Sequence, residues 1–349
     1  MNQPITIWFN RGLSSLADLI PTIRASQQEG ESFRFLVTHP DENTRVRNVA
    51  DVFEREPKPQ SVGEYISWCL DVVERHDVKV LFAGSYAPYI HEAALLFARR
   101  GCAVISAGGH SIQALLKDKG KLYGVVPEGM VPMPWFTTVR DAGSFVQAVA
   151  SANSEDLVCF KPTQGLGGQG FHVISKNGEQ HFSPWNGELL SISLEGALSE
   201  LCGQPQGFPD VMVMQYLDGQ ETSVDCFATN GVLHAAIARV KAYDAVDELL
   251  ADAPDLIEYC RSLTALLTLE GLYNVQFKLG AGKQYLLEIN GRMAGGLHYG
   301  VPSGVNLAYW AIRMAIRTAG AEDIPVPKTG IRVPRVVRVP GAAPVQLGQ

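Results

Sequence analysis

Residues 160–171 read Phe-Lys-Pro-Thr-Gln-Gly-Leu-Gly-Gly-Gln-Gly-Phe, a glycine-rich segment between two apolar runs that are typical of β-strands. The glycines let the backbone approach an anion and point successive N–H groups at it, and Lys161 adds a positive charge beside the loop. No Gly-Lys-Ser/Thr sequence follows, so this is not a Walker loop. The segment predicts a phosphate-binding loop, with a plain flexible turn as the alternative. The glycines concerned are Gly165, Gly167, Gly168 and Gly170.

A second segment, residues 285–292, reads Tyr-Leu-Leu-Glu-Ile-Asn-Gly-Arg and places polar side chains on an otherwise apolar strand. Glu288, Asn290 and Arg292 share one face because side chains alternate along a strand. Burying such groups without partners is costly, and carboxylate and amide oxygens suit Mg²⁺. We therefore expect a metal site here, rather than a strand end frayed into solvent. Gln276 reaches the same place if the two strands form a hairpin.

A third segment, residues 211–221, reads Val-Met-Val-Met-Gln-Tyr-Leu-Asp-Gly-Gln-Glu. An apolar strand enters a turn at Asp218-Gly219, and Glu221 opens the next strand. Such a segment can offer peptide groups to a planar base and a carboxylate to ribose hydroxyls. An ordinary strand-turn-strand connection is the alternative.

The first third of the chain alternates short β-branched or aromatic runs with longer amphipathic patterns. This alternation predicts a doubly wound parallel sheet whose ligands lie beyond the carboxyl ends of the strands. The turns at residues 10–14, which include Arg11, and at residues 84–86 either face a ligand or only connect elements. Strands are expected at 5–9, 33–38, 78–83 and 103–106, and helices at 14–28, 61–76 and 89–100.

Beyond the proline-punctuated stretch at 131–134, strands dominate, which predicts an α+β half. Two hairpins are expected, one turning at Asn230-Gly231 and one at residues 280–282. Strands are expected at 135–139, 157–161, 171–174, 211–217, 222–229, 232–240, 273–279 and 285–289, and helices from 141 and at 194–202, 255–269 and 304–318.

Composition narrows the class of protein. The 349 residues carry 36 acidic and 29 basic side chains, a net charge of −7, which argues against nucleic acid as a partner. With 46% hydrophobic and 19% charged residues, the chain is neither disordered nor a coiled coil. No apolar run approaches the ~18 residues of a membrane span, so we expect a cytoplasmic protein. The six cysteines, without a CxxC pair, are expected to be reduced core thiols.

Along the chain, the segments at 160–171, 211–221 and 285–292 together resemble the ATP-grasp superfamily. This superfamily includes D-alanine:D-alanine ligase, the carbamoyl phosphate synthetase large subunit, biotin carboxylase and many amino-acid and peptide ligases. The resemblance implies a combined α/β and α+β fold. A Rossmann-like pre-ATP-grasp domain would span residues 1–112. An ATP-grasp subdomain with the lid and the glycine-rich loop would span 113–214, and a second one with the metal and substrate site and a C-terminal tail would span 215–349.

The resemblance also implies roles for individual residues. Lys119 and Lys161 would hold the ATP phosphates, although Lys117 and Lys121 flank Lys119, which is preferred because Asp118 precedes it. The glycine-rich loop would close over the phosphates, and Glu221 would bind ribose. The adenine would be held by main-chain groups of Gln215, Tyr216 and Leu217, and Mg²⁺ (or Mn²⁺) by Gln276, Glu288 and Asn290.

Two positions depart from the usual pattern of the superfamily. Gln276 stands where many members carry Asp or Glu, which puts the second metal ion in doubt. Gly291 replaces a common proline between Asn290 and Arg292, which we expect to loosen that turn.

The activity implied is ATP-dependent ligation of a small carboxylate to an amine or thiol through an acyl phosphate. Lys161 and Arg292 are the expected catalytic residues, under a lid of residues about 125–210. The glycine-rich loop after Arg292 would bind substrate through Gly295, Gly296 and His298, although packing is an alternative role for His298.

Several alternatives stay open. Arg239 and Asp225 either face an amino-acid substrate or are surface charges on their strands. A carboxylase that uses bicarbonate through carboxyphosphate and a non-catalytic ATP-binding regulatory protein are the other functions considered. The partners expected are small-molecule carboxylate and amine substrates, not nucleic acid or membrane, and a homodimer is left open.

Overall fold

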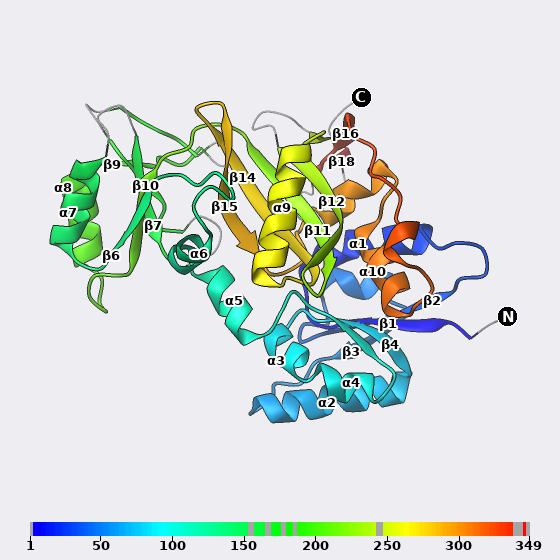
Figure 1. The fold of residues 1–349 in the computed structure, drawn as a ribbon. Helices are drawn as coiled ribbons and strands as arrows, with labels where there is room; N and C mark the ends of the chain where they lie inside the picture. The colour runs from blue at the N-terminus through cyan, green and yellow to red at the C-terminus, as the bar shows by residue number, and fades with distance from the viewer. Residues whose placement is uncertain are drawn as a thin grey trace.

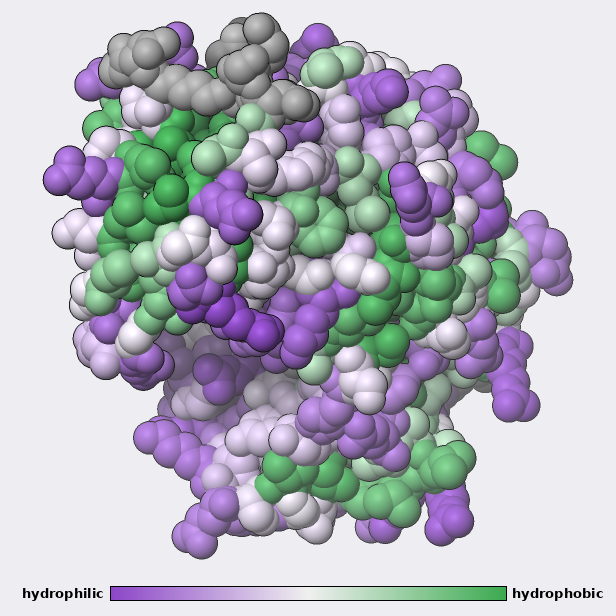
Figure 2. Space-filling view, turned by 60° about the vertical axis from the view of Figure 1, so that its left-hand side comes forward, coloured by the Kyte–Doolittle hydropathy of each residue, from purple (hydrophilic) through white to green (hydrophobic). Residues whose placement is uncertain are grey.

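Three sheets of five or six strands organise the molecule in a computed structural model that describes residues 3–152, 157–164, 169–175, 179–183, 187–241, 247–337 and 345–346 (Figure 1). A further two-stranded sheet is formed by β17 (Val336–Val337) and β18 (Val345–Gln346). The N-terminal sheet lies below and to the right in Figure 1, the second sheet lies at the left, and the third lies between them. Figure 2 shows a mostly hydrophilic face that is hollowed where the lower part of the molecule meets the larger upper part.

The N-terminal sheet has the strand order β3-β2-β1-β4-β5, and all its strand pairs are parallel. Side chains of β1 alternate between two cores: Phe9 packs in the core that contains α1, and Trp8 in the core that contains α2. The predicted doubly wound sheet is therefore confirmed. The elements are β1 (Ile5–Phe9), β2 (Phe33–His39), β3 (Val52–Arg55), β4 (Val78–Phe82), β5 (Ala103–Ile105), α1 (Leu16–Ala25), α2 (Val62–His76), α3 (Ala87–Glu92) and α4 (Ala94–Ala98).

Two local expectations for this sheet were wrong. The short edge strand β3 was missed because Val52–Arg55 holds only two apolar residues. The single helix expected at 89–100 is divided into α3 and α4 at Ala93, which is the C-cap of the first and the N-cap of the second.

The second sheet has the order β6-β10-β7-β8-β9 and packs against α7 and α8. Two short helices, α5 and α6, lead into it from the N-terminal sheet. The elements are α5 (His110–Lys117), α6 (Lys119–Val125), β6 (Phe136–Val139), α7 (Ala142–Ser151), β7 (Val158–Pro162), β8 (His172–Ile174), β9 (Ser191–Ile192), α8 (Leu194–Cys202) and β10 (Val211–Gln215).

The third sheet is antiparallel, with the order β15-β14-β11-β12-β13-β16. One face packs on α9 and the other on α10. Both predicted hairpins are present, and positive φ at Asn230 and Gly231 fits the expected turn. The elements are β11 (Glu221–Thr229), β12 (Val232–Lys241), β13 (Asp247–Leu250), α9 (Pro254–Leu267), β14 (Gly271–Gly280), β15 (Lys283–Asn290), α10 (Leu307–Ala315) and β16 (Ile331–Pro334).

Five of the six cysteines are buried free thiols, as expected, but Cys202 at the end of α8 is exposed. Within the described ranges, no helix has the length and apolar character that crossing a membrane requires. The expected domain boundaries at 112 and 214 stay predictions.

Candidate active site

A backbone contact between the start of α6 and the end of β7 brings the two predicted phosphate-binding lysines, Lys119 and Lys161, close together. Asp118 caps α6 by accepting a hydrogen bond from the Lys121 backbone N–H at 3.1 Å. The backbone N–H of Lys119 donates to the carbonyl of Thr163, at 3.0 Å, just beyond the strand that carries Lys161. Lys119 is largely buried, whereas the side chain of Lys121 is 70% exposed. The fold therefore turns Lys119, rather than Lys121, toward Lys161.

The predicted metal residues lie on adjacent strands beside these lysines. Gln276 on β14 is the register partner of Glu288 on β15. The amide of Asn290 donates to Oε1 of Glu288 at 3.0 Å, and Nζ of Lys119 lies 3.4 Å from Oε2 of the same carboxylate. Arg292 follows the strand end, where its side chain is exposed.

This donor set fits Mg²⁺ in one particular way. It offers one carboxylate and two amide oxygens, which are hard ligands. In the described part of the chain, no cluster of three His, Cys, Asp or Glu side chains forms a cage for a metal ion. An ion held by Glu288, Asn290 and Gln276 would therefore complete its shell with water and phosphate oxygens, as Mg²⁺ commonly does.

Burial lowers the pKa of the second lysine. The pKa of Lys161 falls from its usual 10.5 to about 8, mainly through loss of solvation and also through the charges of Lys119 and Lys278. The thiol of Cys159 and the carboxylate of Glu288 act in the opposite direction. Because an anion at this position would favour the charged form, the site is suited to a phosphate group.

The predicted hinge crosses from β10 to β11 at Gln215, Tyr216 and Leu217. The backbone N–H of Gln215 donates to Trp135 at 3.0 Å, and that of Tyr216 to Leu157 at 2.7 Å, which fixes the crossing. Beyond the hinge, Glu221 pairs with Lys241 at 2.8 Å.

Lys278 is a residue of this region that sequence reasoning missed. It is the register partner of Glu221, and its Nζ lies 5.5 Å from the ring centre of Tyr216. Burial lowers its pKa. The alternation of side chains on β14 was the available signal, because residues 276 and 278 share one face.

The glycine-rich loop can be described only in part. Gly165, Gly167 and Gly168 lie outside the described residues. Gly170 has φ of +68°, and a Cβ there would lie 3.0 Å from the ring of Pro162. That position therefore favours glycine on both conformational and steric grounds.

The turn at Gly291 contacts α5, and the expectation that the glycine loosens this turn stays a prediction. The side-chain amide of Gln113 on α5 donates to the carbonyl of Gly291 at 2.8 Å. A Cβ on Gly291 would lie only 2.6 Å from that amide nitrogen. The glycine therefore allows a close contact that ties the turn between Asn290 and Arg292 to α5.

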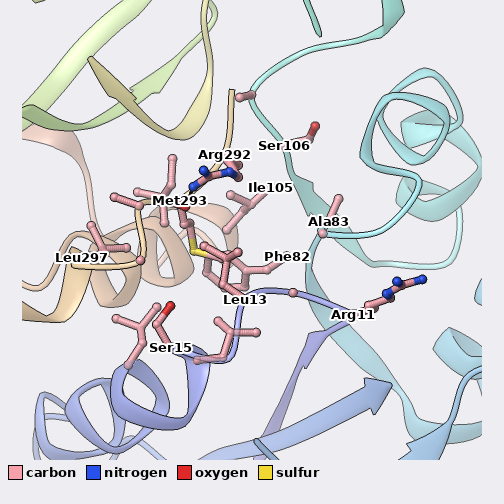
Figure 3. Close-up of a pocket in the computed structure, with 18 of the residues that line it drawn as sticks. Arg11, Leu13, Ser15, Phe82, Ala83, Ile105, Ser106, Arg292, Met293 and Leu297 are labelled. Carbon is pink, nitrogen blue, oxygen red and sulfur yellow. Dashed lines mark hydrogen bonds between the residues drawn. The ribbon is translucent and has the colours of Figure 1, made fainter. Parts of the chain in front are cut away.

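A cavity of about 240 Å³ lies between the N-terminal sheet and the loop after β15 (Figure 3). Its walls come from the loop before α1, the ends of β4 and β5, and the loop that starts at Gly291. Arg292, Gly295 and His298 line it, whereas Gly296 does not. In Figure 3, Arg292 lies on the side of Ile105 and Met293, and Arg11 projects away from the apolar side chains.

Arg239 and Asp225 are not surface charges, and they do not line this cavity. Both are buried, and Arg239 donates to Asp225 through Nε at 2.7 Å and Nη2 at 3.3 Å, and to Glu248 through Nη1. A Cβ on Gly296 would lie 2.6 Å from Nη1 of Arg239. The buried guanidinium therefore supports the loop that carries Gly296 from beneath.

Comparisons with a family model and with solved structures show which proteins this chain resembles. Residues 207–339 match the family model described as ATP-grasp in the biosynthetic pathway with Ter operon. N5-carboxyaminoimidazole synthetase from Staphylococcus aureus is similar in fold, with a TM-score of 0.66 at 14% identity over 95% of this chain and 82% of that one.

Two further solved structures have the same fold. Biotin carboxylase from Campylobacter jejuni has a TM-score of 0.63 at 16% identity, covering 93% of this chain and 74% of that one. L-amino acid ligase from Bacillus licheniformis has a TM-score of 0.59 at 12% identity, covering 93% and 76%. The matched segment contains the predicted metal residues Gln276, Glu288 and Asn290, and the predicted fold class is confirmed. The chain therefore has the fold of these ATP-grasp proteins, and its residues 207–339 match an ATP-grasp family model.

Proposed function

We propose that this protein is an ATP-dependent ligase that joins a small carboxylic acid to an amine or a thiol and releases ADP and phosphate. The observation that carries the proposal is the meeting of Lys119, Lys161 and Glu288 in one cluster, next to a cavity that begins at Arg292. The two lysines, and a metal ion held by Glu288, would neutralise the negative charge of the phosphoryl group that is transferred.

The residues would divide the work as follows. Lys119 and Lys161 bind and orient the ATP phosphates, the hinge at Gln215, Tyr216 and Leu217 holds the base, and Glu221 binds ribose. Mg²⁺ (or Mn²⁺), held by Gln276, Glu288 and Asn290, would supply charge neutralisation on the phosphates.

The acid occupies the cavity with its carboxylate toward Arg292, attacks the γ-phosphate and becomes an acyl phosphate. Arg292 donates to the oxyanion that forms when the amine or thiol displaces phosphate. The glycine-rich loop and the second sheet close over the site to exclude water, because an acyl phosphate in water hydrolyses.

The apolar lining of the cavity favours this reaction over carboxylation through carboxyphosphate. Bicarbonate is small and polar, whereas leucine, isoleucine, methionine and phenylalanine side chains line the cavity and favour the apolar body of an organic acid.

The test is an ADP-release screen of carboxylic acids against amines and thiols. We expect release only with a matching pair, and a fall of about 100-fold or more in Lys161→Met and Glu288→Gln. The matched controls Lys283→Met and Glu258→Gln change exposed residues of β15 and α9 and should keep wild-type rates. ADP release with bicarbonate alone would instead support the carboxylase. ATP binding without ADP release from any acid would support a regulatory nucleotide-binding protein.

A further inference from the structure

We propose that the acid bound in the cavity beside Arg292 has an apolar body and no ammonium group, so that the substrate is a simple carboxylic acid rather than a free amino acid. This inference rests on the proposed function and names its substrate class. It depends on three properties of the cavity: its apolar walls, the sign of its charges and its size.

The walls are dominated by large apolar side chains that come from five different parts of the chain (Figure 3). Side chains of this kind stabilise a bound ligand in proportion to the apolar area that they remove from water. They are Leu13, Leu16, Leu19, Phe82, Ile105, Leu272, Met293 and Leu297.

The charged residues among the described lining are Arg11 and Arg292, and both are cations. Described carboxylates behind the walls are already engaged: Glu56 accepts from the Arg11 backbone N–H at 2.8 Å, and Asp225 and Glu248 pair with Arg239. Because Arg11 projects away from the apolar side chains, an α-ammonium group would enter this cavity beside the cation of Arg292 and without a carboxylate, which is costly. A carboxylate, in contrast, is attracted to the positive charge of Arg292.

The size of the cavity agrees with a medium-sized acid. Its volume of about 240 Å³ is many times the ~10–15 Å³ that one water molecule needs on this measure of volume. The cavity therefore has room for a branched or aromatic acid.

The test compares acids that share a skeleton and differ by the ammonium group. Calorimetric titration of the ADP-loaded, full-length protein would use 4-methylpentanoate against leucine, and 3-phenylpropanoate against phenylalanine. We expect the simple acid of each pair to bind about tenfold or more tightly. Equal or tighter binding of the amino acid, or binding of neither member, overturns the inference.

Ser15→Asp provides a second, independent arm. Ser15 lines the cavity and is the N-cap of α1, where its side chain makes no capping hydrogen bond. Aspartate is a favoured N-cap residue, so the variant should fold. The new carboxylate should shift the ratio of affinities about tenfold toward leucine, whereas the neutral Ser15→Asn should leave it unchanged. An unchanged ratio in Ser15→Asp overturns the inference.

The two proposals fail in different ways. If leucine supports ADP release better than 4-methylpentanoate, the ligase proposal stands and the substrate class is wrong. If 4-methylpentanoate binds selectively but no acid gives ADP, the cavity has the selectivity inferred and the ligase proposal is wrong.

Discussion

Nζ of Lys119 lies 3.4 Å from Oε2 of Glu288, so a predicted phosphate-binding cation and a predicted metal-binding carboxylate form an ion pair between α6 and the third sheet. Lys119 begins α6, and Glu288 lies on β15 of the third sheet. The pair limits the cost of holding each charge in a partly buried site. Binding of nucleotide and Mg²⁺ would break this ion pair. Lys119 would then contact phosphate oxygens, and Glu288 would contact the metal ion.

The low pKa of Lys161 predicts opposite effects of pH on nucleotide binding and on stability. Phosphate binding needs the charged lysine, so the Kd for ATP should rise as the pH increases through about 8. In the ligand-free protein, the unfolded chain binds more protons than the folded one between pH 8 and 10.5, so this group makes the free energy of unfolding rise with pH in that window. Titration calorimetry and urea unfolding between pH 7 and 9.5 measure the two effects.

Lys161→Arg is the control for this prediction. Arginine stays charged throughout the range, so the inflection in ATP affinity near pH 8 should disappear while binding persists. If the ATP affinity of Lys161→Arg shows an inflection of the same size near pH 8, the group that titrates is not Lys161.

Lys278 is predicted to contribute to nucleotide binding and not to the chemical steps. Its ammonium group faces Tyr216 from 5.5 Å and lies opposite Glu221 on the neighbouring strand, where base and ribose are expected. Lys278→Met should raise the Kd for ATP about five- to tenfold, or about 1 kcal/mol, with kcat nearly constant. Lys283→Met, on an exposed residue of the same hairpin, should bind ATP like wild type. A kcat effect larger than the Kd effect would contradict this assignment.

Gly291→Ala is predicted to be mildly destabilising, because a Cβ would lie 2.6 Å from the side-chain amide of Gln113 and displace it from the Gly291 carbonyl. Loss of one such hydrogen bond costs about 0.5–1.5 kcal/mol of unfolding free energy. Gly295→Ala is the matched control, because the nearest atom to its Cβ, Oγ of Ser15, lies at 3.9 Å. In denaturant unfolding, Gln113→Ala combined with Gly291→Ala should cost less than the sum of the two single changes. Simple additivity would show that the clash is relieved in some other way.

Arg239 is predicted to be essential for stability. Arg239→Met leaves the carboxylates of Asp225 and Glu248 buried without their cation and should cost about 3–5 kcal/mol. Arg239→Lys should restore only part of this loss, because the bidentate contact with Asp225 needs the planar guanidinium. Arg332→Met removes an exposed ion pair with Asp247 and should change stability by less than about 1 kcal/mol. Equal losses in Arg239→Met and Arg332→Met would contradict the prediction.

The sequence predicted those features that depend on local spacing. Alternation of strands and helices predicted the N-terminal parallel sheet, and the period of two along β15 predicted that Glu288 and Asn290 share a face. The pairing of Gln276 with Glu288 depends on a shift in the β14–β15 register between Gln276 and Phe277, which the sequence did not predict. The short strand β3 and the break between α3 and α4 were missed, because a four-residue edge strand and a helix boundary without a capping hydrogen bond leave little local signal.

Contacts between distant segments needed the tertiary structure. The pairing of Gln113 with Gly291 joins residues 178 positions apart, and no local pattern connects them. For Arg239, the sequence left two interpretations open, a substrate contact or a position on the surface. Its burial against two carboxylates followed only from the packing of β11, β12 and β13.

By itself, therefore, the sequence determined the fold class and the chemical types grouped on each strand, because side-chain alternation and glycine turns act over a few residues. Only the tertiary structure decided which charges neutralise one another and what the cavity beside Arg292 can accept. Those properties depend on burial and on the distances between elements far apart in the chain, since the strength of a charge pair and the cost of an unpaired group depend on the surroundings.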